Sequence, residues 1–433
     1  MMKLYIINFI LALVAFVNGI SVTGNRTLVV YDDRYAKLDD YSNYFDSLKE
    51  RFEVDFVEVS DKGTQVELTD GLERSYDNLL VFPVKTKALN KRVSAQKLLD
   101  FMEQGGNVMT VHSPETATES VRVFWTQLGV HPATKGYELV NDFTKGELDT
   151  PLESLNNDVF PKNSAGKKLV IGKAATALLG ANEFIVPVLQ AERVSQCVKA
   201  DRKRWSAGPE GYLAVGFQNA INARALWIGS ADAFLNSNYE SNKEFLNEIS
   251  KWVFNEKAVI KVVNVAHQHI DGTTYEERPY KVTDNISYEI ALSEWNGKQW
   301  VPFERNDVQF ELRQIDPYYR ITMKAVRGGD KAVIYSTGDF KLPDRHGMFT
   351  FLTDYKRPGL SYIHESDVRA IRHLANDEYP RSWTITNSWV YLSAIYGVIC
   401  VWIVFVILFV VTGKKQAAVT TKKQAAATEK KNE

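Results

Sequence analysis

The sequence predicts an α/β region, then a β-sandwich-like region, then a single C-terminal transmembrane helix. Between residues 25 and 256, apolar strand-like runs alternate with amphipathic helical segments, the pattern of a parallel sheet covered on both faces. After Glu256 the strand-like runs are separated by turn residues without a helical period, which is typical of a β-sandwich. Trp389–Val411 contains no charged residue and exceeds the about 20 apolar residues that a bilayer-spanning helix needs.

Residues 1–19 have the layout of a cleavable secretory signal peptide. Lys3 precedes the apolar run Leu4–Val17, and Val17 and Gly19 form a plausible pair for cleavage after residue 19. An uncleaved membrane anchor is the alternative, but the run is shorter than the about 20 residues that a span requires. We therefore expect the α/β region to begin at residue 20.

The α/β region, residues 20–256, contains eight strand-like runs: TLVVYD, VDFVEVS, NLLVFPV, NVMTVHS, KLVIG, EFIVPVL, GYLAVGFQ and RALWIGS. Apolar residues spaced by three and four predict helices between them. These residues are Leu38, Tyr41, Phe45, Leu48 and Phe52; then Val121, Phe124, Trp125 and Leu128; then Phe245, Ile249, Trp252 and Val253. Another helix, AQKLLDFME, is expected to stop at Gly105-Gly106. We expect a mostly parallel sheet, in one large unit or two small ones.

Residues 257–388 form the predicted β-rich region and lead to the membrane. Their strand-like runs are VIKVVNVAH, KVTDNISYEIAL, WVPFERNDVQFELR, YYRITMKAV and KAVIYSTGDF. The span is assigned to 389–411 and the tail to 412–433. A buried core helix is disfavoured because the span is apolar on every face. Trp383 and Trp389 suit an interfacial aromatic belt.

The lysine-rich tail predicts the orientation. Short loops rich in lysine stay in the cytosol, so the bulk of the chain should lie in the lumen, as the signal peptide also predicts. The chain is thus expected to be a type I membrane protein. Its net charge is −1, and the luminal part lacks the basic stripe that a nucleic-acid partner would require.

Only two cysteines are present, and Cys400 lies inside the predicted span. Cys197 therefore has no luminal partner for an intrachain disulfide. A free thiol and an intermolecular bridge both remain open, and we favour a thiol without a functional role.

Several sequence patterns approach a catalytic or binding motif without completing it. GKKLVIGKA resembles a phosphate-binding loop, but its glycines are one residue too far apart and Ala174 replaces the hydroxyl residue. His267 and His269 could be two metal ligands on one strand face, but a third is not evident nearby. His364-Glu365 lacks the second histidine of a zinc protease, and no Asp-x-Asp pair for a metal-bound sugar nucleotide occurs. We therefore expect no metal and no cofactor.

The turn in GGNVMTVHSPET occupies the place where some α/β enzymes carry a nucleophile. It offers His112 and Ser113 rather than a G-x-S-x-G or G-x-C-x-G elbow. The acidic pairs Asp32-Asp33 and Asp39-Asp40 follow a strand and begin a helix, where acidic residues are favoured in any case. No catalytic residue is predicted.

Two N-x-S/T sequons lie on the predicted luminal side, at Asn25 and Asn285. Asn285 follows a turn and is the better candidate for glycosylation, whereas Asn25 leads directly into a strand. At the C-terminus, the KKQAA repeats could be a solvated tail without further role. The last pair, Lys430 and Lys431, however, stands two residues from the end, the spacing of the dilysine signal that coat proteins read to return membrane proteins to the endoplasmic reticulum.

The segment LPDRHGMFTFLTDYKRPGLSYIHESDVRAIRHLANDEYPRSW resembles the stretch before the membrane span in the 48-kDa-type subunit of oligosaccharyltransferase, and most of all its fungal form. The matching positions are Pro343, Asp344, Gly347, Phe349, Phe351, Asp354, Tyr355, Arg357, Gly359, Val368, Arg372, His373, Glu378, Tyr379 and Arg381. The resemblance extends to RTLVVYDDR, YDNLLVFP, the GGN turn, GFQNAINARALWIGS, the single span and the Lys-Lys-x-x end.

This resemblance implies an amidotransferase-like α/β fold and a non-catalytic role in transferring a preassembled glycan from dolichyl diphosphate to asparagine. The implied partners are a ribophorin II-type subunit, a small defender-type subunit and a separate multi-spanning catalytic subunit. An independent luminal glycan-processing enzyme or a cycling cargo receptor are the alternative functions. The missing nucleophile and Asp-x-Asp pair disfavour the enzyme, and the Leu342–Trp383 match disfavours the receptor.

Overall fold

The structure of the chain is a computed structural model. It describes residues 21–59, 68–70, 73–85, 89, 93–116, 118–141, 149–151, 159–160, 168–379 and 387–430. Two compact units are present, one up to Arg372 and one from His373 onward. The first unit contains the α/β region and the β-rich region, and the second contains the long apolar helix.

Five parallel strands form one half of a nine-stranded sheet, in the order β2-β1-β5-β6-β16. Their bounds are β1 Arg26–Tyr31, β2 Glu53–Glu58, β5 Asn78–Val81, β6 Asn107–Val111 and β16 Arg224–Ile228. Every residue of β5, β6 and β16 is buried, as strands covered on both faces require. The predicted parallel sheet is confirmed in this half.

The other half of the sheet is antiparallel. It contains β15 Tyr212–Gln218, β12 Ile185–Gln190, β11 Ala177–Leu179 and β7 Val130–Pro132. A short hairpin joins β15 to β16, and strands joined this way must be antiparallel, because a parallel neighbour needs a long crossover. The sheet is therefore mixed, which the apolar runs alone did not reveal.

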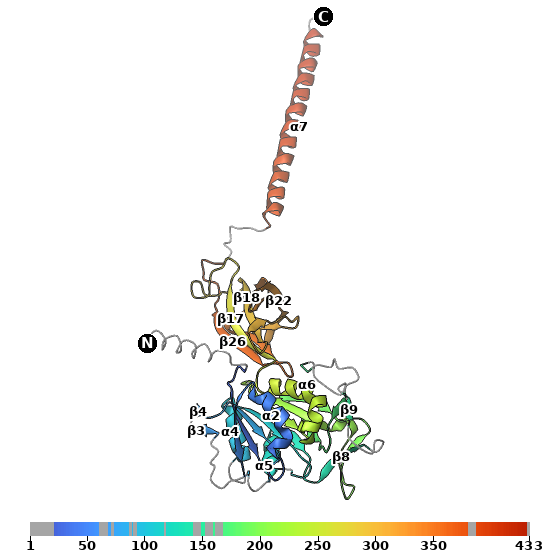
Figure 1. Cartoon of the computed structure of the whole chain (residues 1–433). Coiled ribbons are helices and arrows are strands. Elements are labelled where there is room, and N and C mark those ends of the chain that lie inside the picture. The colour runs from blue at the N-terminus through green and yellow to red at the C-terminus, as the bar shows by residue number, and fades with distance from the viewer. Residues whose placement is uncertain are drawn as a thin grey trace, which may run out of the picture. The chain divides into compact units, whose positions relative to one another are not determined.

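Helices cover both faces of the sheet (Figure 1). The 3₁₀ turn η1 Leu38–Tyr41 leads into α2 Ser42–Lys49, which packs on α6 Asn236–Val253, whereas α4 Ala95–Glu103 packs on α5 Glu119–Gln127. The Ser94 side chain accepts a hydrogen bond from the Lys97 amide at the start of α4, and Gly105 follows its end with φ of 87°. The predicted apolar faces are buried, including Phe245, Ile249 and Trp252.

Short elements border the main sheet. A three-stranded sheet contains β8 Tyr137–Asn141, β13 Ser195–Lys199 and β14 Arg204–Ala207. Two further pairs of strands are β3 Thr69–Asp70 with β4 Glu73–Arg74, and β9 Asp149–Pro151 with β10 Lys168–Val170. Short 3₁₀ turns are η3 Gly208–Glu210 and η4 Asp232–Phe234.

Two antiparallel sheets form the predicted β-sandwich. One contains β17 Val259–His269, β18 Asn285–Trp295, β19 Trp300–Pro302, β22 Lys324–Gly328, β23 Val333–Ser336 and β24 Phe340–Lys341. The other contains β20 Gln309–Arg313, β21 Pro317–Thr322, β25 Gly347–Tyr355 and β26 Ile363–Ile371. Between them the rings of Tyr288 and Phe310 lie 4.5 Å apart, and the Tyr288 hydroxyl is 3.0 Å from that of Thr353. The sandwich prediction is confirmed.

The second unit contains α7 Ser388–Glu429, the candidate membrane-spanning helix. It is apolar along the predicted span and continues through the tail, where alanine, lysine and glutamine are good helix formers. The tail is therefore helical as far as Glu429. The predicted signal peptide and Lys431 lie outside the described residues.

Candidate functional site

The carboxyl ends of parallel strands are where open α/β sheets bind their ligands. Asp32 lies there, directly after β1, and is fully buried. Its carboxylate accepts hydrogen bonds from the Arg34 guanidinium at 2.9 and 2.7 Å and from the Lys85 amide at 3.4 Å. Burial opposes ionisation, but these hydrogen bonds lower the pKa of Asp32 below its usual value. Asp32 therefore holds its own loops together, and its oxygens are already used.

His112 follows β6 at the same end of the sheet. It is buried beside Trp227, with ring centroids 5.7 Å apart, and burial lowers its pKa to about 4. Its Nε2 atom has no hydrogen-bond partner among the described residues. A neutral histidine enclosed in this way does not activate the neighbouring Ser113, so the turn lacks the base and nucleophile pair of an amidotransferase-like enzyme.

The loop that resembles a phosphate-binding motif is occupied by acidic groups. The Lys173 amide donates to the Asp232 carboxylate at 2.9 Å, and the Lys173 ammonium pairs with Glu115 at 2.8 Å. A phosphate needs such an amide and ammonium free. Both groups of Lys173 are engaged by acidic side chains here.

The two histidines of β17 do not form a metal site. His267 uses both ring nitrogens, one with the Tyr280 hydroxyl and one with Asp367, each at 2.8 Å. His269 Nε2 lies 3.0 Å from the Arg278 carbonyl. In the part of the chain that the structure describes, no group of three or more His, Cys, Asp or Glu side chains could hold a metal ion.

Arg224 is the most unusual buried residue of the chain. It is fully enclosed at the start of β16, and no carboxylate of the described residues pairs with it. Its guanidinium donates to the Gln218 side chain and to the carbonyls of Trp252, Lys257 and Ala258 at 2.6 to 3.0 Å. Burial lowers its pKa to about 9, which leaves it charged at neutral pH. The arginine therefore connects α6 and the start of β17 to the sheet.

We call this region the domain junction: the β15–β16 hairpin (218–224), residues 252–258 and the loop 359–362. The Asn222 side chain bonds both the amide and the carbonyl of Tyr362, at 2.6 and 3.0 Å, and Gln218 donates to the Leu360 carbonyl at 2.7 Å. Trp252 Nε1 donates to the Gly359 carbonyl at 2.8 Å. The two longest stretches of the family resemblance thus meet here, although about 140 residues separate them.

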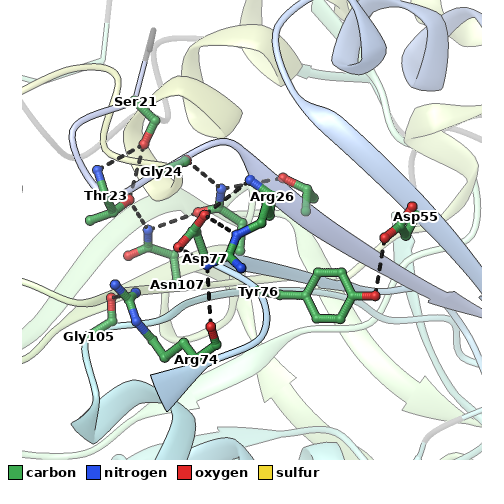
Figure 2. Close-up of polar contacts among 12 residues, drawn as sticks. Ser21, Thr23, Gly24, Arg26, Asp55, Arg74, Tyr76, Asp77, Gly105 and Asn107 are labelled. Carbon is green, nitrogen blue, oxygen red and sulfur yellow. Dashed lines mark hydrogen bonds and ion pairs between the residues drawn. The ribbon is translucent and has the colours of Figure 1, made fainter. Parts of the chain in front are cut away.

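The amino ends of the parallel strands carry a polar network (Figure 2). Asp77 accepts from the Arg26 amide at 3.1 Å and from its guanidinium at 3.3 Å. Asn107 donates to Asn78 at 3.0 Å and accepts from the Arg224 amide at 3.1 Å, which links the network to the domain junction. The motif YDNLLVFP contributes Asp77 and Asn78, and RTLVVYDDR, GGN and ARALWIGS contribute one member each. The members of this network therefore lie opposite the edge where α/β enzymes bind ligands, in a structural role.

A cavity of about 440 Å³ opens between β17 and β26, and we call it the sandwich cavity. His267, Glu276, Glu365, Asp367 and Arg369 line it, and Phe351 and Tyr288 also border it. Asp367 bonds His267 and Arg369 at 2.8 and 2.9 Å, and Arg369 also pairs with Glu276 at 2.9 Å. The sequence analysis missed this cavity. The alternating charges of Glu365, Asp367 and Arg369 on one strand face were the available clue.

The predicted modification and address residues are not among the residues that line the sandwich cavity. Asn285 is exposed as the first residue of β18. Asn25 is half-buried, and its Oδ1 atom is enclosed without a hydrogen-bond partner among the described residues. Cys197 is buried in β13, and burial raises the pKa of its thiol, which fits a thiol without a role. Lys430 follows the last residue of α7.

Two family models match the chain. The OST48 N-terminal domain matches residues 18–256, and the OST48 middle domain matches residues 267–413. Together they cover the α/β region, the sandwich and the apolar part of α7.

Curated relatives match over nearly the whole chain. The WBP1 subunit of dolichyl-diphosphooligosaccharide–protein glycosyltransferase from Saccharomyces cerevisiae is 46% identical over 90% of this chain and 93% of its own length. The 48 kDa subunits from Danio rerio and Arabidopsis thaliana are 27% and 26% identical, over 90% and 92% of this chain and 92% and 95% of theirs. The chain belongs to the OST48 family.

Proposed function

We propose that the chain is a non-catalytic subunit of oligosaccharyltransferase, the complex that transfers a preassembled glycan from dolichyl diphosphate to asparagine in N-x-S/T sequons. The observation that carries this proposal is the 46% identity to a yeast subunit of that enzyme over 93% of its length. The occupied carboxyl edge of the sheet supports it, because Asp32 and His112 leave no catalytic pair there. Catalysis then belongs to a separate multi-spanning subunit.

The decisive experiment is purification of the tagged full-length chain in mild detergent, with mass spectrometry and a sequon-peptide glycosylation assay. We expect a multi-subunit complex that glycosylates the peptide, including the ribophorin II-type, the small defender-type and the catalytic subunits. A purification without the multi-spanning subunit, or transfer by this chain alone, would overturn the proposal.

The proposed location is the endoplasmic reticulum membrane, with the bulk of the chain in the lumen and α7 as the single span. The apolar part of α7 and the lysine-rich residues beyond it support this orientation. Protease added to sealed microsomes should remove only a C-terminal epitope. If the protease instead removed an epitope placed before Ser388, the chain would have the opposite orientation in the membrane.

The proposed retrieval signal consists of Lys430 and Lys431, read by a cytosolic coat at a fixed distance from the free carboxylate. Residues 412–433 grafted onto a type I reporter should retain it, and alanines appended after Glu433 should release it. Equal retention by the extended tail would mean that the spacing is not read. A reporter is preferable to the full chain, where partner subunits could mask the signal.

Asn285 is the proposed glycosylation site, and its exposure at the start of β18 supports this assignment. Asn25 is the weaker candidate because its side chain is half-buried beside β1. Endoglycosidase should shift the wild-type band, and Asn285→Gln should reduce that shift, whereas Asn25→Gln should leave it unchanged. An unchanged shift in Asn285→Gln would exclude this site.

Docking of α7 to partner helices is proposed to use its small residues, Ser393, Ala394 and Gly397, because close packing drives helix association in a bilayer. Nothing lies within 4 Å of a side chain added at Gly397. Gly397→Leu should therefore weaken co-purification of the partners without unfolding the chain. Ala417→Leu, beyond the apolar part, is the matched control. Full recovery of partners with Gly397→Leu would contradict this use of the helix.

A further inference from the structure

The sandwich cavity lies between two edge strands. β17 ends one sheet and β26 ends the other. Residues 273 and 274 pair with the last two residues of β17, and the Tyr275 hydroxyl donates to the Ala370 carbonyl of β26. Along the rest of their outer sides, neither strand pairs with a further strand among the described residues. Edge strands leave backbone N–H and C=O groups unpaired, and these groups can accept an added strand from another chain. The opening of the cavity therefore offers backbone hydrogen bonds as well as side chains.

The charges lining the cavity favour a cationic ligand. Three carboxylates, Glu276, Glu365 and Asp367, face a single guanidinium, that of Arg369. Arg369 pairs with Glu276 and Asp367, whereas the carboxylate of Glu365 forms no hydrogen bond or ion pair with any described residue. Glu365 is thus an uncompensated carboxylate at the mouth of a cavity large enough for a long side chain.

Other ligand classes fit the cavity less well. The excess of carboxylates repels a phosphate or diphosphate. A sugar would need an open aromatic face, but the Arg369 guanidinium lies 4.9 Å from the centre of the Tyr275 ring, and His267 stacks on Phe351 at 4.8 Å. The described carboxylates and histidines do not converge as metal ligands.

We propose that β26 and the sandwich cavity bind an extended segment of the acceptor polypeptide, which adds as a strand along β26 and places a lysine or arginine side chain beside Glu365. This inference rests on the proposed function, in which the substrate is an unfolded chain. Binding through the backbone tolerates many sequences, as a general acceptor site must. One added strand also buries far less than the about 1,200 Å² of a stable subunit interface, so the occupant exchanges.

The test uses the purified complex and three acceptor peptides that share one sequon. The first has no flanking segment, the second has a flank alternating lysine and threonine, and the third has a flank alternating glutamate and threonine. We expect wild-type kcat/KM to be roughly fivefold higher for the lysine flank than for the glutamate flank, as about 1 kcal/mol of ion pairing gives. Added salt should reduce that ratio.

Glu365→Gln, which keeps the size of the side chain, should bring the ratio close to one. Glu304→Gln is the matched control, since Glu304 is an exposed carboxylate of the same sandwich outside the cavity lining, and it should keep the wild-type ratio. A ratio near one in the wild type, or an unchanged ratio in Glu365→Gln, would overturn the inference. Failure to glycosylate even the unflanked peptide would instead refute the proposed function.

A photocrosslinker in the lysine flank locates the occupant directly. We expect adducts within residues 363–371, and fewer of them in Glu365→Gln. Adducts confined to other subunits, or to parts of this chain away from β26, would show that β26 is not the acceptor site.

Discussion

In the α/β region the polar side chains of the amino-edge network and of the domain junction are matched by neighbours, whereas in the sandwich the Glu365 side chain faces an open cavity without a partner. Asn78, Asn107 and Arg224 bond to residues of other strands and of the domain junction. Glu365 has no such partner, although Asp367 and Arg369 on the same strand are paired.

This difference separates residues that hold the fold from residues that are available to a ligand. A buried polar group that has all its hydrogen bonds is costly to disturb and leaves nothing for a substrate. An unpaired carboxylate in a cavity slightly lowers the free energy of unfolding. The simplest explanation for its presence is that it binds a ligand. The comparison therefore predicts large stability losses from changes in the α/β region and almost none at Glu365.

The largest loss is expected for Arg224→Met. The substitution removes the donor from the Lys257 carbonyl and from the Gln218 side-chain oxygen, whereas the carbonyls of Trp252 and Ala258 keep weaker backbone donors. Each unsatisfied group costs about 1–3 kcal/mol. We expect the free energy of unfolding to fall by about 4 kcal/mol, with new protease sensitivity near residues 254–258. Pulse proteolysis in urea of the purified full chain measures both.

Arg204→Met is the control for Arg224→Met, because Arg204 is exposed on β14. It should change the free energy of unfolding by less than about 0.5 kcal/mol. Arg224→Lys should recover part of the loss, because an ammonium reaches fewer of the carbonyls than a guanidinium. A loss below about 1 kcal/mol for Arg224→Met would mean that the junction does not depend on this residue.

A pH-dependent loss is expected from His112. Burial lowers its pKa to about 4 from 6.5, so the unfolded chain binds a proton that the folded chain refuses between these values. The free energy of unfolding should therefore decrease as pH falls from about 6.5 to about 4, by about 3 kcal/mol. His112→Phe should remove this part of the pH dependence, and the exposed His131→Phe should not. If the free energy of unfolding changed with pH equally in the wild type and in His112→Phe, this role of His112 would be refuted.

A smaller loss is expected for Gly24→Ala at the amino edge. Gly24 has φ of 128°, and an added Cβ would collide with the Asp77 carboxylate that holds Arg26 (Figure 2). We expect a loss of about 2 kcal/mol. Gly272→Ala is the control: its φ is 85°, but nothing lies within 4 Å, so only backbone strain remains. Equal losses in the two variants would mean that the contact with Asp77 contributes nothing.

The elements were predictable from the sequence where hydrophobic patterns are local. The helix faces around Phe101 and Trp252, the buried parallel strands and the sandwich all follow from spacing and apolar runs. The antiparallel half of the sheet was not predictable, because an apolar run such as β12 has the same appearance in either orientation. Strand direction is decided by the connections, and the hairpin before Arg224 became visible only in the structure.

The roles of individual polar residues were less predictable, because their partners are distant in the sequence. His267 was considered as a metal ligand, yet its ring contacts Asp367, which lies 100 residues later. Arg224 was a single charge beginning an apolar run, and the carbonyls that it bonds lie 28 to 34 residues away. The sequence motifs were enough to identify the family. Only the structure showed that several of these motifs meet in the domain junction.

The smallest effect is expected for Glu365→Gln, and it separates binding from stability most sharply. The carboxylate has no hydrogen bond or ion pair with a described residue to lose, and Gln keeps the size of the side chain. The free energy of unfolding should therefore stay within about 0.5 kcal/mol of the wild type, or rise slightly. Asp367→Asn, which disturbs the hydrogen bonds to His267 and Arg369, should lose clearly more in the same urea titration. If Glu365→Gln destabilised the chain as much as Asp367→Asn, Glu365 would belong to the scaffold, and the difference between the two regions would disappear.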